Sequence, residues 1–501
     1  MAEENGQVQT SMQRPAKIAW LMPSLIEGSG GHRTILQNVA ALEARGHECH
    51  LYVELKPAQR PSTSAIRKQV IEQLRDYFGY TSPETRVHLG FKIDQPVDLV
   101  FATAWYTAKF VRNIQQQCRK AYFVQDYEAW FMPMGDGFLE AERSYQLGLT
   151  PISIGRWLTH TLAHKYGCAG TWFDFCADLS VYKRIESIER TPSVCFIFQP
   201  EKPRRCPMLG MNALGIVKKQ RPDVNIIFYG SRADTKHVWF EHEHRGLVTI
   251  EQCNHIYNEC QVGLCISSSN PSRIPFEMMA AGLPVVDMHR DNNLYDIPEQ
   301  GALLTPTKPE AIARGILTLL DDPDRRERMG AFGQQFMKNH NLSVGFEQFV
   351  RAVEDLLAGR TQTWSDRAHN IQPMYYRSPD MIGAPLRQHG AHQNGTSRML
   401  GEMIDAQMFA RQELARIENS RSYKALTGLK KNPMYAAWAR SRYGHNWNHV
   451  DLNEDAMQKL QRIKNSRTYR MLMGAKQTGV YRMYAKRKWG EQVANDLQKT
   501  K

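Results

Sequence analysis

The chain has 501 residues, 42% of them hydrophobic, and a formal net charge of +13. This length predicts two or three domains with cores of their own, and no apolar run of about eighteen residues is present to form a membrane-spanning helix. The nine cysteines are odd in number and scattered, which argues against a disulfide framework and favours reduced thiols in the cytoplasm.

The positive charge is concentrated at one end of the chain. Residues from 411 onward carry 20 Lys and Arg against 7 Asp and Glu, and the rest of the chain has 44 of each kind. The larger part is therefore neutral, and any inference from charge to partner applies to the C-terminal end alone. Residues 1–15 contain acids and lack the apolar segment of a secretory signal, so we expect a disordered tail there.

Residues 16–190 alternate apolar strands with helical segments. The expected strands cover 17–23, 49–53, 97–105, 121–127 and 150–157. Continuous apolar strands separated by helices are typical of a parallel sheet that is covered on both faces. We therefore predict a Rossmann-like N-terminal domain over this range, on the acceptor side of the molecule.

Residues 191–358 repeat the same pattern. The expected strands are 194–200, 225–231, 247–251, 262–269, 284–288 and 302–306, with helices at 208–220, 309–320, 323–339 and 344–357. Two such units in tandem predict an α/β fold with two doubly wound domains facing a cleft, the second of them binding a nucleotide sugar. Ligands of such sheets collect at the carboxyl ends of the strands, so the segments that follow the strands are the candidate sites.

The remaining chain differs in character. Residues 359–405 are polar and without periodicity, which predicts a flexible linker. Residues 406–501 contain two copies of one sequence, 414–444 and 460–490, at a constant offset of 46 residues. This basic helical tail could bind an anionic membrane surface, bind a polyanionic glycan, self-associate, or be a solvated appendage. No nucleic-acid-binding motif is recognisable in it.

The first candidate site is the stretch SSSNPSRIPFEMMAAGLPVVD, from Ser267 to Asp287. A turn after an expected strand enters an apolar helix that carries one acid, Glu277. Free N–H groups at a helix start favour phosphate or sugar hydroxyls, and Glu277 could accept hydrogen bonds from a ribose diol. The alternative is that Glu277 only complements the helix dipole.

Two further loops carry glycines or cations. EGSGGHRTIL (27–36) follows the first strand, and Gly30 and Gly31 permit close backbone approach without the full dinucleotide-binding spacing. QPEKPRRCPM (199–208) places Arg204 and Arg205 where guanidinium groups could clamp a diphosphate. A plain strand-to-helix turn and a solvated charge cluster are the respective alternatives.

A fourth segment, FVQDYEAWF (123–131), sets Asp126 and Glu128 beside aromatic residues. This combination suits a sugar, because hydroxyls need acceptors and C–H faces pack on rings, and either acid could act as a general base. The alternative is a capped helix start with buried aromatics. No metal site is expected, since the His and Cys residues of 241–260 lack the spacing of zinc ligands.

Taken in order, these segments resemble a retaining GT-B glycosyltransferase of family 4, and in detail the rhamnosyltransferase WsaF-like group. The matching pieces are YFVQDYEAWF, ISIGRWL, QPEKPRRC and SNPSRIPFEMMAAGLPVV, and the likeness covers residues 17–357. The resemblance implies a metal-independent hexosyltransferase that uses a nucleotide sugar, dTDP-rhamnose. Its acceptor would be a growing surface glycan or glycolipid, at the inner face of the membrane.

The resemblance also implies which residues touch the donor. They are Gly30 and Gly31 at the diphosphate or the acceptor, Arg204 or Arg205 at the diphosphate, Gly230 and Ser231 at the nucleobase, Ser272, Arg273 and Ile274 at the sugar and its phosphate, and Glu277 at the ribose. The catalytic candidates are Asp126 and Glu128.

Two positions depart from the family pattern. The first Glu of the E-x7-E motif is replaced by Ser269, so the usual acidic contact with donor-sugar hydroxyls is missing, which fits a deoxysugar such as rhamnose. Gln125 and Asp126 stand where many relatives have a histidine-containing segment. A transferase using a GDP- or UDP-sugar and a non-catalytic scaffold for a sugar nucleotide or glycan are the alternatives. As a transferase, the chain would use arginines to stabilise the departing diphosphate, without a side-chain nucleophile.

Overall fold

The computed structural model describes residues 14–55, 64–379 and 456–466 and the single residues Leu414, Ile417 and Ser441. The chain divides into two compact units, Met1–Arg387 and Gln388–Lys501, and each is described by itself. Most of the expected N-terminal tail and most of the two repeats lie outside the described residues.

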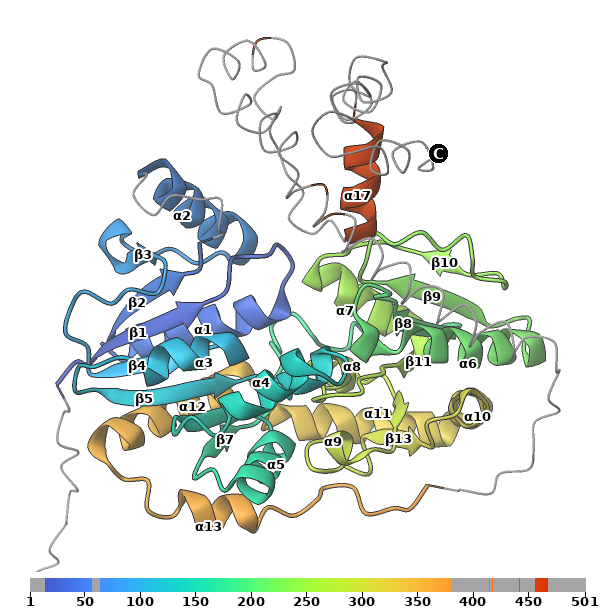
Figure 1. Ribbon diagram of the computed structural model, residues 1–501. Helices are drawn as coiled ribbons and strands as arrows, with labels where there is room; N and C mark the ends of the chain where they lie inside the picture. Colours follow the sequence, from blue (N-terminus) through green and yellow to red (C-terminus); the bar gives the residue numbers. More distant parts are fainter. Residues whose placement is uncertain are drawn as a thin grey trace, which may run out of the picture. The chain divides into compact units, whose positions relative to one another are not determined.

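The first sheet of the larger unit has seven strands in the order β3-β2-β1-β4-β5-β6-β7 (Figure 1). Their bounds are β1 Lys17–Met22, β2 Glu48–Val53, β3 Val87–Leu89, β4 Leu99–Ala102, β5 Arg119–Val124, β6 Thr150–Ile154 and β7 Thr171–Phe173. All pairs are parallel, and β4 is buried at every residue. Burial of both faces explains why these strands are continuous apolar runs.

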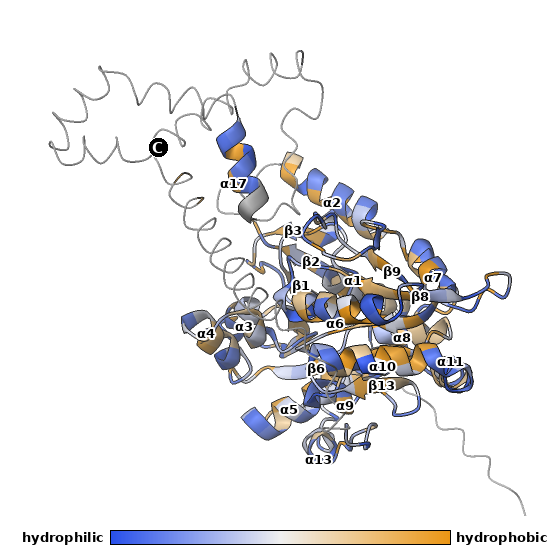
Figure 2. Ribbon diagram, turned by 90° about the vertical axis from the view of Figure 1, so that its right-hand side faces the viewer, coloured by the Kyte–Doolittle hydropathy of each residue, from blue (hydrophilic) through white to orange (hydrophobic). Residues whose placement is uncertain are grey.

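Helices connect these strands. They are α1 Gly30–Ala44, α2 Ser64–Phe78, α3 Trp105–Arg112, α4 Asp136–Ser144 and α5 Arg156–Tyr166, with short 3-10 turns at Glu84–Arg86 and Glu128–Phe131. Helix α2 is largely hydrophilic (Figure 2) and buries only Val70 and Leu74. The expected N-terminal Rossmann-like arrangement is therefore present, with a lightly attached second helix.

The second sheet has six strands in the order β10-β9-β8-β11-β12-β13 (Figure 1). The strands are β8 Thr191–Ile197, β9 Asn225–Tyr229, β10 Glu243–His244, β11 Cys260–Leu264, β12 Val285–Met288 and β13 Ala302–Thr305. The helices are α6 Pro207–Gln220, α7 Ile250–Glu259, α8 Ile274–Ala280, α9 Asp291–Leu294, α10 Pro309–Asp321 and α11 Pro323–Lys338, with a 3-10 turn at Pro203–Arg205. Both sheets thus follow the strand order of doubly wound folds.

The strand expected at 247–251 is not formed. Thr249 instead caps α7: its side chain accepts a hydrogen bond from the N–H of Gln252, and the Gln252 side chain accepts one from the N–H of Thr249. This reciprocal cap satisfies two helix-end donors and outweighs the apolar run that suggested a strand. The edge strand lies earlier, at Glu243–His244.

Helix α12 (Leu342–Ala358), expected to be part of the second domain, packs on the first sheet. It contacts β7 and α1. Its Phe349 ring lies 6.1 Å from Trp20, 5.4 Å from Phe123 and 5.5 Å from Phe173, measured between ring centroids. The core of the N-terminal domain is therefore completed by a helix from beyond the second sheet.

The flexible linker expected from residue 359 is not found over 359–379. These residues include helix α13 (Trp364–His369), which contacts α5 and β7, and Trp364 and Tyr375 are each only 3% exposed. The Tyr375 hydroxyl accepts a 3.1 Å hydrogen bond from the N–H of Leu304. The buried apolar residues of this polar segment are Trp364, Ala368, Ile371 and Tyr375. They are too few to produce a periodic pattern, which is why the sequence suggested a linker.

The smaller unit is described only in part. Helix α17 (Ala456–Asn465) buries Leu460 and Ile463 in one cluster with Leu414 and Ile417. These four residues are two pairs separated by 46 positions, the offset of the sequence repeat. Equivalent positions of the two copies therefore lie in one apolar cluster.

Candidate functional site

The carboxyl edges of the two sheets are joined by hydrogen bonds between Asp126, which follows β5, and Asn270, which follows β11. The Asn270 N–H donates to Asp126 Oδ1 at 2.8 Å. The Asn270 side-chain amide donates to the carbonyls of Gln125 at 2.9 Å and Ile154 at 3.2 Å. The loops in which the sequence placed its candidates thus meet in space.

A turn of three cations lies at this junction. Ser268 holds the turn through two hydrogen bonds to the Arg204 carbonyl, at 2.9 Å from its N–H and 3.2 Å from its hydroxyl. The Arg204 guanidinium lies 3.7 Å from Asp126 and over the Phe131 ring at 4.5 Å. Burial lowers the pKa of Arg204 and, with the neighbouring arginines, lowers that of Lys202 to about 8.

Arg205 is the third cation of this turn. Within the described residues, its buried Nε and Nη1 atoms donate no hydrogen bond. Burying an unpaired cation costs several kcal/mol or more, so such groups usually face a counter-ion. A planar guanidinium beside two other cations is the arrangement that binds phosphate oxygens.

A second charged cluster joins α8 to α1. Arg273 donates a 2.8 Å hydrogen bond from Nη1 to the side chain of Gln37, and its buried Nε has no partner within the described ranges. Glu277 lies one turn into α8, and burial raises its pKa to about 7 against the opposing effects of Arg273 and Arg33. A carboxyl group whose pKa lies near 7 and is influenced by two guanidinium groups can accept hydrogen bonds from a diol.

The remaining donor candidates occupy strand-to-helix turns. Gly30 and Gly31 are the first residues of α1 and are exposed, with Ser29 as the cap. A Cβ on Gly31 would meet the Gln125 side chain at 3.6 Å. Ser272 accepts a 3.3 Å hydrogen bond from the N–H of Ile274, the first residue of α8. These residues border the junction from both domains.

Gly230 and Ser231 follow β9 on the second domain. Gly230 has φ of 95°, and a Cβ there would meet Ile197 at 2.7 Å. Its carbonyl accepts a 2.9 Å hydrogen bond from Gln199, and Ser231 is buried. In the described part of the chain their contacts lie within this domain alone, so the structure does not bring them against Arg204, Arg273 or Asp126.

The two catalytic candidates make different contacts. Asp126 accepts hydrogen bonds from the Asn270 and Tyr127 N–H groups. Glu128 is 8% exposed and accepts a 2.8 Å hydrogen bond from the Trp105 N–H. Burial raises its pKa to about 8. Glu128 is therefore placed to hold α3 against the 128–131 turn, whereas Asp126 orients Arg204.

Several residues of this junction were not among the candidates predicted from the sequence. Arg33 and Gln37 follow the glycine turn on α1, and Asn270 stands inside the SSSNPSR segment. Asp296 accepts hydrogen bonds from the N–H groups of Arg156 at 2.7 Å and Trp157 at 3.1 Å, and so caps α5 of the other domain. Only Arg33 had a usable signal, a cation in the first turn after a glycine-rich loop.

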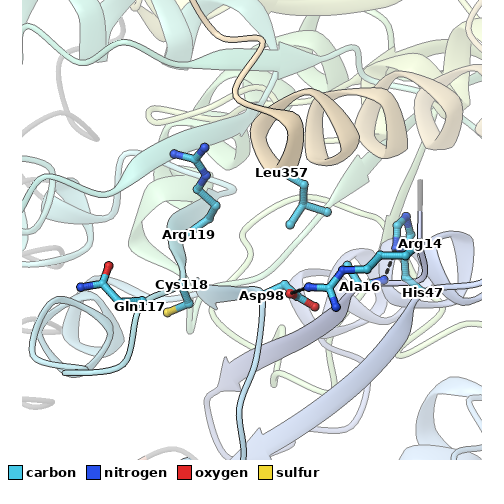
Figure 3. Close-up of a pocket in the computed structure, with 8 residues that line it drawn as sticks. All are labelled: Arg14, Ala16, His47, Asp98, Gln117, Cys118, Arg119 and Leu357. Carbon is cyan, nitrogen blue, oxygen red and sulfur yellow. Dashed lines mark hydrogen bonds and ion pairs between the residues drawn. The ribbon is translucent and has the colours of Figure 1, made fainter. Parts of the chain in front are cut away.

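The pocket in Figure 3 lies at the opposite edge of the first sheet. It has a volume of about 470 Å³ and is lined by residues near the starts of β1, β4 and β5 and by Leu357 of α12. Arg14, expected in the disordered tail, borders it and donates a 2.8 Å hydrogen bond to Asp98. Because ligands of doubly wound sheets bind at the carboxyl ends of strands, this pocket is distinct from the junction.

The described part of the chain contains neither a metal-binding cluster nor a membrane-spanning helix. No three His, Cys, Asp or Glu side chains gather there in an arrangement that could hold a metal ion. None of the helices described is both long enough and apolar enough to cross a membrane.

Solved structures share this architecture. TarM of S. aureus, solved with UDP, fondaparinux and alpha-GlcNAc-glycerol, is 9% identical with a TM-score of 0.51 over 68% of this chain and 99% of that chain. A glycosyltransferase from Rickettsia africae is 11% identical with a TM-score of 0.48 over 69% of this chain and 99% of that chain. Two doubly wound parallel sheets that meet at their carboxyl edges define the GT-B fold of glycosyltransferases.

The sequence matches are more specific. Residues 192–317 match the family described as "WsaF, C-terminal domain". The chain is also 27% identical over 285 residues to the O-antigen biosynthesis protein RfbC of Myxococcus xanthus, covering 55% of this chain. It spans only 22% of the length of that relative. Residues 192–317 of this GT-B protein are thus similar to the C-terminal domain of WsaF, as the resemblance in sequence predicted.

Proposed function

We propose that the chain is a retaining glycosyltransferase that moves a sugar from a nucleoside-diphosphate donor to a glycan. The observation that carries this proposal is Arg205, whose buried guanidinium nitrogens lack partners within the described residues, beside Lys202 and Arg204. Such a turn fits a diphosphate, and it lies at the interdomain junction of a GT-B fold.

The donor-binding residues then have distinct tasks. Arg205 and Lys202 would bind the diphosphate and stabilise the charge that develops on it as the glycosidic bond to phosphate breaks. Arg273 would reach the phosphate or sugar, and Glu277 would accept hydrogen bonds from the ribose. Gly230 and Ser231 would border the nucleobase. The acceptor oxygen would form the new bond on the same face, and its proton would pass to the leaving phosphate.

We propose rhamnose, carried by dTDP, as the donor sugar. Support comes from the WsaF-type domain at 192–317 and from Ser269, which stands where a carboxylate would contact donor-sugar hydroxyls in the resembling family. The relative named for O-antigen biosynthesis supports a surface polysaccharide as the acceptor. UDP, bound in the TarM structure, is the competing nucleotide. The nine free cysteines support a cytoplasmic location.

A thermal-shift screen tests the proposal. The full chain is heated with dTDP, UDP or GDP in the presence of EDTA, and a ligand of the folded state must raise the midpoint. We expect the largest increase with dTDP, and its loss in Arg205→Ala. The control is Arg351→Ala, an exposed cation on α12 with a side chain 72% exposed. No increase with any nucleotide would overturn the proposal, and an increase with UDP or GDP alone would replace the donor.

A further inference from the structure

A carboxylate outside the donor site stands at the edge of the first sheet where three adjacent strands end. Ser24 follows β1, Glu54 follows β2 and Tyr106 lies just past β4. Glu54 Oε2 accepts hydrogen bonds from the Tyr106 hydroxyl at 2.8 Å and from the Ser24 N–H at 3.3 Å. The Ser24 hydroxyl donates to the same oxygen at 3.4 Å. One oxygen of Glu54 is thus fixed by two neighbouring strands.

The second carboxylate oxygen of Glu54, Oε1, has a different environment in the described part of the chain. Within the described residues Oε1 accepts no hydrogen bond, and no Lys, Arg or His forms an ion pair with Glu54. The side chain is half-buried rather than enclosed. Burial and the adjacent Glu54 and Glu128 raise the pKa of Tyr106 above its usual range, so its hydroxyl remains a donor to Glu54. Among the residues described, the group is therefore a fixed acceptor with one oxygen that receives no hydrogen bond.

This group is linked to the donor junction. Trp105, next to Tyr106, donates from its N–H to Glu128, and the 3-10 turn that begins at Glu128 ends at Phe131, which lies under the Arg204 guanidinium. Trp130 and Phe131 are 40% and 43% exposed. Exposed aromatic rings pack on the C–H faces of sugars, so the surface of this turn suits a bound glycan.

We infer that Glu54, oriented by Tyr106 and Ser24, binds hydroxyl groups of a neutral acceptor sugar. This inference rests on the proposed transferase function and adds a selectivity to it. An acceptor phosphate or uronate would meet an unpaired carboxylate at this position, whereas a neutral sugar donates hydrogen bonds to it. The residue thus discriminates between acceptors by charge.

Saturation-transfer NMR with the full chain and saturating nucleotide tests the inference. The probes are methyl glycosides of rhamnose, mannose, glucose and galactose, with methyl glucuronide as the anionic counterpart. We expect signals from at least one neutral glycoside and none from the glucuronide. Glu54→Gln and Tyr106→Phe should each weaken binding about tenfold, the usual effect of losing a hydrogen bond to a charged group. Asp94→Asn, with a side chain 70% exposed on the same domain, is the control.

The outcomes are separable. Equal signals from Glu54→Gln and wild type, stronger binding of the glucuronide, or no glycoside signal from wild type would each overturn the inference. The thermal shift given by the nucleotide is measured on all four proteins and reports both folding and donor binding. Its absence from wild type overturns the proposed function instead, and its retention in the variants shows that lost glycoside binding is local.

Discussion

The backbone N–H of Asn270 donates a 2.8 Å hydrogen bond to Asp126, and the same carboxyl group lies 3.7 Å from the guanidinium of Arg204. Asp126 belongs to the first domain, whereas Asn270 and Arg204 belong to loops of the second. One carboxylate therefore fixes the cationic turn and the loop after β11 at once. The positions of these donor-binding loops depend on the contact between the domains.

Removing the Asn270 side chain should weaken this contact. Asn270→Ala leaves the backbone bond to Asp126 but deprives the carbonyls of Gln125 and Ile154 of a donor. We expect a loss of about 1–3 kcal/mol in unfolding free energy and weaker nucleotide binding. Urea unfolding and nucleotide titration measure both. Asn370→Ala, which removes an exposed 2.8 Å hydrogen bond to Asp366, should change neither appreciably; similar losses in the two variants would contradict the interdomain role.

The buried carboxyl of Glu128 predicts an unusual pH dependence. Its pKa is about 8 in the folded chain against 4.5 for the free group, so the folded state holds a proton that the unfolded state releases over this range. The contribution to stability is then largest at acid pH and declines as the pH rises toward 8. Glu128→Gln should flatten that decline.

Urea unfolding from pH 5 to pH 8 measures how the free energy of unfolding changes with pH in wild type and in Glu128→Gln, and the two slopes are compared. The control is Glu140→Gln, whose side chain is 54% exposed and should leave the wild-type slope unchanged. The same pH dependence for Glu128→Gln and wild type would show that Glu128 is ionised in the folded protein.

Removing the Asp296 side chain should lower the free energy of unfolding by more than the loss of an ordinary helix cap does. It accepts from the N–H groups of Arg156 and Trp157 across the domain boundary, and Asp296→Ala would leave both donors buried. We expect a loss above the roughly 1 kcal/mol typical of a cap and faster amide exchange in α5. Asp322→Ala provides the comparison, because Asp322 caps α11 within one domain by accepting from the Arg325 N–H. Equal losses would mean that the domain boundary adds nothing.

Gly230→Ala should weaken nucleotide binding as well as stability. The residue combines φ of 95° with a Cβ position only 2.7 Å from Ile197. Gly46→Ala separates these costs, because Gly46 has φ of 98° with no atom within 4 Å of an added Cβ. Both variants should lose about 1 kcal/mol from backbone strain. Only Gly230→Ala should shift Ile197 and reduce the rise in thermal midpoint that the nucleotide causes. If that rise is the same in Gly230→Ala as in wild type, the nucleobase binds elsewhere.

The sequence predicted the parallel sheets well because their strands are buried on both faces. A run such as that of β4 has no other stable place than the middle of a sheet. It also predicted the loops that carry Arg204, Arg273 and Glu277, since ligand sites of such sheets follow the strands. The sequence could not predict which side chain of the other domain each of these residues would contact.

Gln37 and Asp296 illustrate the limit. Gln37 is one polar residue on a helix, and its meaning comes from Arg273, 236 positions away. Asp296 follows a short helix and has no local pattern that distinguishes it from a surface acid, yet it caps a helix of the other domain. Helical periodicity shows that α12 has an apolar face, but not which of the two sheets that face covers.

The position of Phe349 has a consequence for the order in which the protein is made. Its ring completes the cluster of Trp20, Phe123 and Phe173, yet the ribosome adds it only after the whole of the second sheet. Domains usually fold one after another from the N-terminus during synthesis. Here the first domain emerges with an open core and must remain so until the second has been translated, so the two halves reach their final packing together.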